Sequence, residues 1–129
     1  MAHILIVEDN LVNQKLMQAI VSGAGYTTHV AANGRLAVEF LEHQSVDLVF
    51  MDLMMPVMDG FEATRRIRND LQLTHLPIIA VTANTLVGSK ERALESGCND
   101  YIAKPYTKQQ LLGALNQWLR GSSDQFQPV

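Results

Sequence analysis

An acidic residue follows directly after a short, continuously apolar run. Residues 48–51 have the pattern of a strand that is buried on both faces of a sheet, and Asp52 comes next. Pro56 and then Asp59-Gly60 indicate a loop that leads into a helix. Open α/β sheets place their chemistry at the carboxyl ends of parallel strands. Asp52 is therefore a candidate nucleophile or metal ligand, unless it is an isolated strand-end carboxylate.

Other polar side chains follow the remaining apolar runs in the same way. They are Glu8 and Asp9 after residues 3–7, Thr82 after residues 77–81, and Lys104 after residues 100–103. Clustered carboxylates repel one another unless a cation joins them, and oxygen-only ligands suit a hard ion such as Mg²⁺. No His or Cys follows these runs, which argues against zinc. Carboxylate, divalent ion, ammonium and hydroxyl are the groups that phosphoryl transfer to a carboxylate requires.

The apolar runs alternate with segments of helical spacing. Strands are expected at residues 3–7, 26–31, 48–51, 77–81 and 100–103, and each is followed by a helix. This alternation implies βαβ units with right-handed crossovers and a parallel sheet covered on both faces. The predicted fold is an α/β, flavodoxin-like (βα)5 doubly wound sandwich with strand order 2-1-3-4-5. That order places the first and third strands side by side.

Local signals indicate where several helices begin and which residues they bury. Asn10 is a plausible N-cap, and Thr107 with Gln110 matches a capping box. The expected apolar positions are Val12, Leu16, Met17, Ile20 and Val21 in the first helix, and Leu36, Ala37, Phe40 and Leu41 in the second. In the third helix, Arg65, Arg66 and Arg68 are expected to be solvated. A weaker helix is expected at residues 85–96, which include Gly88 and few apolar residues.

Size and composition are those of one globular domain. Of the 129 residues, 47% are hydrophobic and 18% are charged. We expect a domain at residues 1–120 and a linker or disordered tail at 121–129. A net charge of −3 and the lack of a basic run argue against direct nucleic-acid binding. The single cysteine, Cys98, fits a reducing compartment and hence the cytoplasm, and no apolar run has the length of a membrane span.

Four motifs of the chain occur together in one known family. They are Val7-Glu8-Asp9-Asn10, Met51-Asp52-Leu53-Met54-Met55-Pro56-Val57-Met58-Asp59-Gly60, Ala80-Val81-Thr82-Ala83 and Tyr101-Ile102-Ala103-Lys104-Pro105. With them the chain resembles the receiver domain of two-component response regulators, from Ile4 to Leu119. More narrowly, Asn13-Gln14 and Phe61-Glu62-Ala63-Thr64-Arg65 resemble the receivers of hybrid sensor histidine kinases.

The resemblance implies a phosphoacceptor and a metal site. Asp52 would accept a phosphoryl group from a phosphohistidine of a sensor histidine kinase or a histidine phosphotransfer protein. Mg²⁺ or Mn²⁺ would be bound directly by Asp9, Asp52 and the main-chain carbonyl of Met54, and by Glu8 mostly through water. The domain would be a signalling switch rather than an enzyme, with at most slow self-dephosphorylation, as a monomer or a weak phosphorylation-dependent dimer.

The resemblance also implies a conformational readout. Thr82 and Lys104 would contact the phosphoryl group, and Lys104-Pro105 would be a cis peptide. Thr82 would move toward the phosphoryl group, and Tyr101 would turn into the space that this opens. The face made by the fourth helix, fifth strand and fifth helix would then change shape. As an alternative, Tyr101 is an ordinary half-buried strand residue. Met54 and Asn84 would lie at the mouth of the site, and the thioether of Met54 predicts a long-lived phospho-aspartate.

Three other functions share parts of this pattern. A haloacid-dehalogenase-type hydrolase would usually carry a second Asp where this chain has Met54. A flavin-binding module would need a phosphate-cradling loop after the first strand, where Glu8 and Asp9 would repel phosphate. A pseudo-receiver would only bind partners. The histidines, His3, His29, His43 and His75, match no site pattern and are interpreted as solvated or packed side chains.

Overall fold

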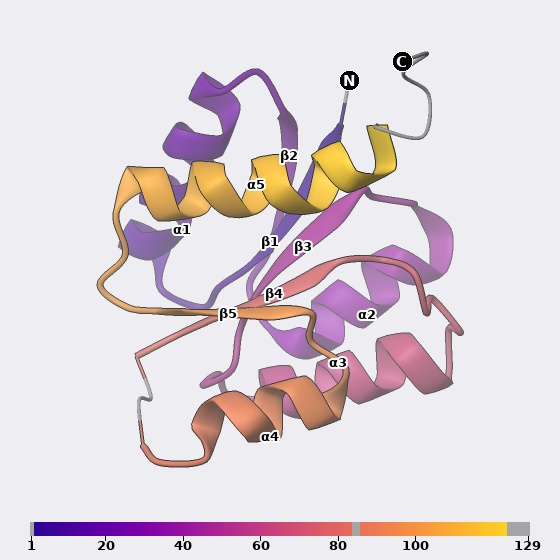
Figure 1. The fold of residues 1–129 in the computed structure, drawn as a ribbon. Helices are drawn as coiled ribbons and strands as arrows, with labels where there is room; N and C mark the ends of the chain where they lie inside the picture. Colours follow the sequence, from indigo (N-terminus) through magenta and orange to yellow (C-terminus); the bar gives the residue numbers. More distant parts are fainter. Residues whose placement is uncertain (1, 84–85, 124–129) are drawn as a thin grey trace.

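A computed structural model describes residues 2–83 and 86–123, and Figure 1 shows their arrangement. Over these residues, five strands alternate with five helices. The elements are β1 His3–Val7, α1 Leu11–Gly23, β2 Thr27–Ala31, α2 Gly34–His43, β3 Leu48–Asp52, α3 Gly60–Asn69, β4 Ile78–Thr82, α4 Ser89–Ser96, β5 Asp100–Ala103 and α5 Lys108–Ser123.

All neighbouring strands of the sheet are parallel, in the order β2-β1-β3-β4-β5. The predicted strand order is therefore confirmed. Val7 pairs with Met51, so the residues that follow them, Glu8 and Asp52, end adjacent strands at the same level. Thr82 pairs with Ala103, the residue before Lys104. The register thus brings the polar side chains after β1, β3, β4 and β5 to one edge of the sheet.

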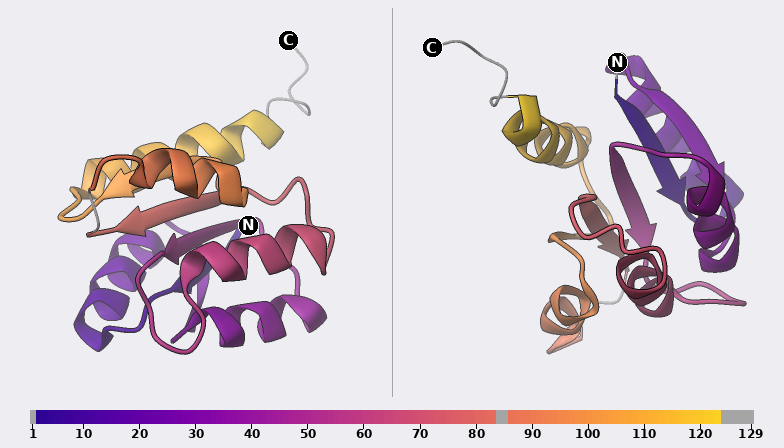
Figure 2. Two further views of the ribbon diagram at one scale, coloured as in Figure 1. Left: turned by 90° about the horizontal axis from the view of Figure 1, so that it is seen from below. Right: turned by 90° about the vertical axis from the view of Figure 1, so that its right-hand side faces the viewer.

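Two helical layers cover the sheet, α1 and α5 on one face and α2, α3 and α4 on the other (Figures 1 and 2). Alternate residues of each central strand serve the two layers. Ile4 and Ile6 of β1 pack in the α1/α5 core, whereas Leu5 and Val7 pack in the α2/α3/α4 core. Every residue of β3 is buried, as its continuous apolar pattern predicted.

Side-chain caps fix the start of several helices. Asn10 Oδ1 accepts a hydrogen bond from Asn13 N at 3.0 Å. Thr107 Oγ1 accepts from Gln110 N at 3.1 Å, while Gln110 Oε1 accepts from Thr107 N at 2.8 Å. The N-cap at Asn10 and the capping box at Thr107 are therefore confirmed. The first of these caps determines where the chain turns after Glu8 and Asp9.

The predicted apolar faces of α1 and α2 were partly wrong. Val12 and Leu16 are 73% and 51% exposed, and Leu36 is 45% exposed. In α1 the buried stripe passes through Met17 and Val21, one residue further along and so roughly 100° around the helix. Val12 and Leu16 consequently face away from the sheet, and α1 exposes apolar side chains to solvent.

The prediction that Arg68 is solvated was also wrong. Its guanidinium donates to the carbonyl oxygens of Leu73, Leu76 and Gly97 and to Asn99 Oδ1, at 2.6 to 3.0 Å. Burial lowers the pKa of Arg68, against a smaller opposing effect of Cys98. Arg68 thereby joins the end of α3 to the segments that precede β4 and β5.

The start of α4 differs from that expected. Helix α4 begins at Ser89 rather than at residue 85, because Gly88 takes up a left-handed conformation with φ 88° and the helix starts only after it. Helix α5 extends to Ser123, and the division into a domain at 1–120 and a linker or tail at 121–129 stays a prediction. Asn84 and residues 124–129, which include most of the expected tail, lie outside the described residues.

Candidate functional site

Three charged side chains meet at the carboxyl edge of the sheet. Lys104 Nζ lies 2.6 Å from Glu8 Oε1 and 3.1 Å from Asp52 Oδ2. Glu8 and Asp52 are only 2% and 5% exposed. Two carboxylates at this depth require a partner charge, and Lys104 supplies one. The three residues follow β1, end β3 and follow β5, respectively, as the strand order requires.

The charges of the carboxylates act back on the lysine. Burial alone would lower the pKa of Lys104, but the hydrogen bond to Glu8 and the negative charges of Asp52 and Glu8 outweigh it, so the pKa is raised above its usual value. Lys104 is therefore an ammonium group throughout the physiological pH range. The edge of the sheet carries a fixed positive charge directly beside the carboxylate of Asp52.

Asp52 is also held by the loop that follows it. Its Oδ1 accepts a hydrogen bond from Met54 N at 3.1 Å. The loop then returns to the strand, where Gly60 N donates to Leu53 O at 3.1 Å. A Cβ atom on Gly60 would collide with the main-chain carbonyl of Asp52. Gly60 of the Asp59-Gly60 pair seen in the sequence is thus needed for the loop to close against the end of β3.

Asp9 completes a cluster of carboxylates. One oxygen atom from each of Glu8, Asp9 and Asp52 lies within 4.8 Å of the others, and Asp9 is exposed. The cluster offers oxygen ligands only and is open to solvent at Asp9, and two of its three negative charges are not balanced by Lys104. This donor set fits a hard divalent cation such as Mg²⁺. Glu8, Asp9 and Asp52 would hold that ion.

Comparisons with known proteins identify the family of this chain. Residues 4–116 match the response regulator receiver domain. The chain belongs to this family. Its general function is phosphoryl acceptance in two-component signalling, as a switch rather than a conventional enzyme. This membership decides against the hydrolase and the flavin-binding module as alternatives.

The receiver is similar to proteins of two kinds. It is 35% identical over 116 residues to the polar-differentiation response regulator DivK of Brucella anthropi, covering 90% of this chain and 94% of DivK. It is 41% identical over 119 residues to hybrid signal transduction histidine kinase M of Dictyostelium discoideum, covering 88% of this chain but 5% of that protein. The chain therefore corresponds to a whole protein in one case and to a small part of one in the other.

The chain is also similar to solved structures of receiver domains from histidine kinases. The receiver domain of sensor histidine kinase PA1611 from Pseudomonas aeruginosa PAO1 is 43% identical, with a TM-score of 0.86, over 92% of this chain and 98% of that one. That structure contains a magnesium ion coordinated in its active site cleft. The receiver domain of a signal transduction histidine kinase from Syntrophus aciditrophicus is 34% identical, with a TM-score of 0.87, over 94% and 92% of the two chains.

The remaining predicted site residues are Thr82, Tyr101, Pro105 and Met54. Thr82 is completely buried, and its carbonyl accepts a hydrogen bond from Lys104 N at 2.8 Å. The Lys104–Pro105 peptide bond is cis. Tyr101 is half-buried, and its hydroxyl lies 3.3 Å from Ser89 Oγ at the start of α4. Met54 is 57% exposed. The structure thus brings Glu8, Asp9, Asp52 and Lys104 together and leaves Tyr101 in contact with α4.

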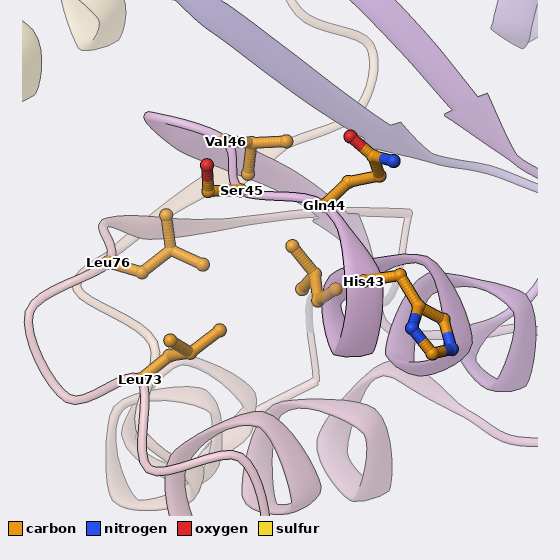
Figure 3. Close-up of a pocket in the computed structure, with 7 residues that line it drawn as sticks. His43, Gln44, Ser45, Val46, Leu73 and Leu76 are labelled. Atoms are coloured by element: carbon orange, nitrogen blue, oxygen red, sulfur yellow. The ribbon is translucent and has the colours of Figure 1, made fainter.

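A separate cavity lies at the other end of the sheet (Figure 3). It has a volume of about 300 Å³ and lies between the segment before β3 and the segment before β4. Its lining residues are Leu41, His43, Gln44, Ser45, Val46, Leu73 and Leu76. None of them is a predicted site residue, and the lining contains no carboxylate or lysine. This cavity therefore offers none of the groups predicted for phosphoryl transfer to a carboxylate, and the carboxylate cluster stays the candidate site.

Gln14 is the residue of the site to which the sequence analysis gave no role. Its Nε2 atom donates a hydrogen bond of 2.6 Å to the main-chain carbonyl of Glu8. The motif Asn13-Gln14 was noticed as part of the resemblance, but its spacing from Glu8 gives no signal of a contact.

Within the described part of the receiver, no helix is both long and apolar enough to cross a membrane.

Proposed function

We propose that Asp52 is the phosphoacceptor of this receiver and that the donor is a phosphohistidine of a sensor histidine kinase or a histidine phosphotransfer protein. An oxygen of the Asp52 carboxylate attacks phosphorus, the phosphorus–nitrogen bond breaks, and the imidazole keeps the electron pair and takes up a proton. The observation that carries the proposal is the placement of Asp52 beside Lys104, Glu8 and Asp9.

The surrounding residues favour a phosphoryl group at this position. The ammonium group of Lys104, already 3.1 Å from Asp52 Oδ2, offsets negative charge on the incoming phosphoryl oxygens. Mg²⁺ or Mn²⁺, when bound by Asp9, Asp52, the carbonyl of Met54 and, through water, Glu8, would neutralise the same charge. The exposed Met54 lacks a strong hydrogen-bond acceptor for an attacking water, which supports a slow loss of the phosphoryl group.

An apolar surface beside the site supports docking of a phosphodonor protein. Leu11, Val12 and Leu16 of α1 are 62%, 73% and 51% exposed. Next to them is a cavity of about 290 Å³, lined by Asn13, Leu16, Ala83, Lys104, Pro105 and Tyr106. Exposed apolar patches of this kind mark protein interaction sites. A partner bound there would bring its histidine to the edge of the sheet that carries Asp52.

The proposed readout is a change in the α4, β5 and α5 face. Thr82, buried at the end of β4, would move toward the phosphoryl group, and Tyr101 would follow. Tyr101 contacts Ser89 in α4, a helix of eight residues that has no side-chain N-cap. Weakly stabilised elements are those that change most readily in a switch. We place the domain in the cytoplasm, as a monomer or a weak phosphorylation-dependent dimer.

The decisive experiment is phosphorylation by a small molecule. Wild type and Asp52→Asn are incubated with acetyl phosphate and Mg²⁺, and intact mass is measured. We expect the mass of one phosphoryl group on the wild type and none on the variant. Equal labelling of both would place the phosphoacceptor elsewhere. No labelling of either would favour the pseudo-receiver, which only binds partners.

A further inference from the structure

The main-chain carbonyl of Glu8 belongs to the peptide group between Glu8 and Asp9, the two acidic residues that follow β1. Gln14, one turn into α1, is half-buried and donates its Nε2 hydrogen bond to this carbonyl at 2.6 Å. Its side chain therefore fixes the plane of the peptide between Glu8 and Asp9. Rotation of that plane would change the main-chain angles on both sides of it and would move Asp9 relative to Glu8.

The side chain of Glu8 is held from several directions. Its Oε2 accepts from Asn10 N at 3.0 Å and its Oε1 from Lys104 Nζ at 2.6 Å, while its own N donates to Ala31 O at 3.0 Å. The carboxylate of Asp9, in contrast, is exposed and accepts no hydrogen bond from any residue of the ranges 2–83 and 86–123. The position of Asp9 is thus determined by its main chain, and Gln14 holds the peptide group on its N-terminal side.

We propose that Gln14 is a positioning residue for the divalent metal site. Without its hydrogen bond, the repulsion between the neighbouring carboxylates of Glu8, Asp9 and Asp52 would turn the Glu8–Asp9 peptide and carry Asp9 toward solvent. The cluster would then be less well arranged to bind the ion. This inference rests on the proposed function, because it requires that the cluster binds Mg²⁺.

The chain offers a matched control on the same helix. Gln18 lies one turn beyond Gln14, is also half-buried, and donates its Nε2 hydrogen bond to Thr28 Oγ1 at 3.0 Å. It contacts β2 and no residue of the cluster. Gln14→Met and Gln18→Met remove the same donor from the same helix with a side chain of similar length. A merely structural role of Gln14 predicts equal effects of the two changes.

The test is isothermal titration calorimetry of the wild type and both variants with MgCl₂ alone, which measures Mg²⁺ affinity. Urea unfolding without added metal measures the stability of the same three proteins. We expect a comparable loss of stability in both variants, Mg²⁺ affinity about tenfold lower in Gln14→Met, and a change below about twofold in Gln18→Met. Gln14→Ala, in which alanine favours the helix, is a second version in case methionine prevents folding.

Each result has a distinct meaning. If Gln14→Met, Gln14→Ala and Gln18→Met all bind Mg²⁺ with the affinity of the wild type, the inference is overturned. The proposed metal site would still stand, provided that Asp52→Asn weakens binding. An equal loss of affinity in all three would also overturn it, because the effect would then follow stability. If the wild type binds no Mg²⁺, the metal site of the proposed function fails, and the inference fails with it.

Discussion

Lys104 lies nearer to Glu8 than to Asp52, with Nζ–oxygen distances of 2.6 and 3.1 Å. The ammonium group therefore lies between two carboxylates that would also attract a divalent ion. A single cation faces two deeply buried anions, so one of their two negative charges stays unbalanced, and the third carboxylate, Asp9, is exposed. Lysine and metal are expected to compete for the same negative charge.

This competition predicts opposite effects of Lys104→Met on stability and on metal affinity. Removing the ammonium should lower the free energy of unfolding without metal by about 2–3 kcal/mol, since Glu8 and Asp52 lose their partner charge while Lys104 itself is partly exposed. Mg²⁺ affinity should rise about tenfold. Urea unfolding and calorimetry measure both quantities. Lys108→Met, at an exposed position of α5, is the control. Unchanged or weaker Mg²⁺ binding in Lys104→Met would contradict the competition.

Val57 predicts that the loop after Asp52 can be stabilised. This residue has φ 70°, although β-branched side chains are strongly disfavoured in the left-handed region, and it is 74% exposed. Val57→Asn should raise the free energy of unfolding by about 1 kcal/mol, because asparagine tolerates this conformation. Val12→Asn, equally exposed but helical, should be neutral or slightly destabilising. A gain in both variants would point to exposed valine rather than to the backbone conformation.

The contacts of Arg68 predict that it contributes more to the free energy of unfolding than Arg66 of the same helix. Arg68→Lys removes the planar fork that reaches the carbonyls of Leu73, Leu76 and Gly97, and should lower the free energy of unfolding by about 2–3 kcal/mol. Arg66→Lys affects only an exposed pair with Glu62 and should cost less than about 0.5 kcal/mol. Urea unfolding of the two variants checks this difference. Similar values would mean that the Arg68 contacts contribute little.

The same two arginines illustrate what sequence can and cannot predict. The topology was predictable, because continuous apolar runs such as β3 can be buried on both faces only in a sheet covered by helices. The meeting of Glu8, Asp52 and Lys104 then followed from the strand order. A side chain that reaches back to the main chain gives no such periodic signal. Arg68 and Gln14 could therefore not be distinguished from the solvated Arg66 or from Gln18.

Helix faces and boundaries were predictable only in part for a similar reason. Val12 and Leu16 have the spacing of a buried stripe, but Met17 and Val21 compete with them for the sheet, and only the packed structure decides which stripe is buried. Gly88 was recognised as unfavourable for a helix. Its left-handed conformation, after which α4 begins at Ser89, has no counterpart in the spacing of apolar residues.

Cys98 predicts a pH dependence. Burial raises the pKa of its thiol, and the opposing effects of the Thr64 hydrogen bond and of Arg68 are smaller. A raised pKa favours the folded state while the thiol is protonated. This contribution is therefore fully present below the unfolded pKa of about 8.5 and is lost as pH rises through the higher folded pKa. Wild type should lose more stability between about pH 8 and 10 than Cys98→Ala. If the free energy of unfolding changes with pH in the same way in the wild type and in Cys98→Ala, the thiol does not cause this pH dependence.

The contact between Trp118 and Asp100 predicts an optical signal for the switch. Trp118, the only tryptophan of the chain, donates from Nε1 to Asp100 Oδ2 at 3.2 Å, and Asp100 directly precedes Tyr101 on β5. A turn of Tyr101 should disturb this hydrogen bond and change Trp118 fluorescence. We expect beryllofluoride with Mg²⁺ to produce the change in the wild type.

The dependence of that signal on Thr82 tests the coupling itself. In Thr82→Ala the fluorescence change should be mostly lost, because the hydroxyl that we propose moves toward the phosphoryl group is absent. Binding of beryllofluoride, monitored by fluorine NMR, should persist. Thr64→Ala is the matched control, since Thr64 is equally buried but contacts Cys98 at a distance from the site. A full fluorescence change in Thr82→Ala would show that Trp118 responds by another route, and Tyr101 would then be an ordinary packed residue of β5.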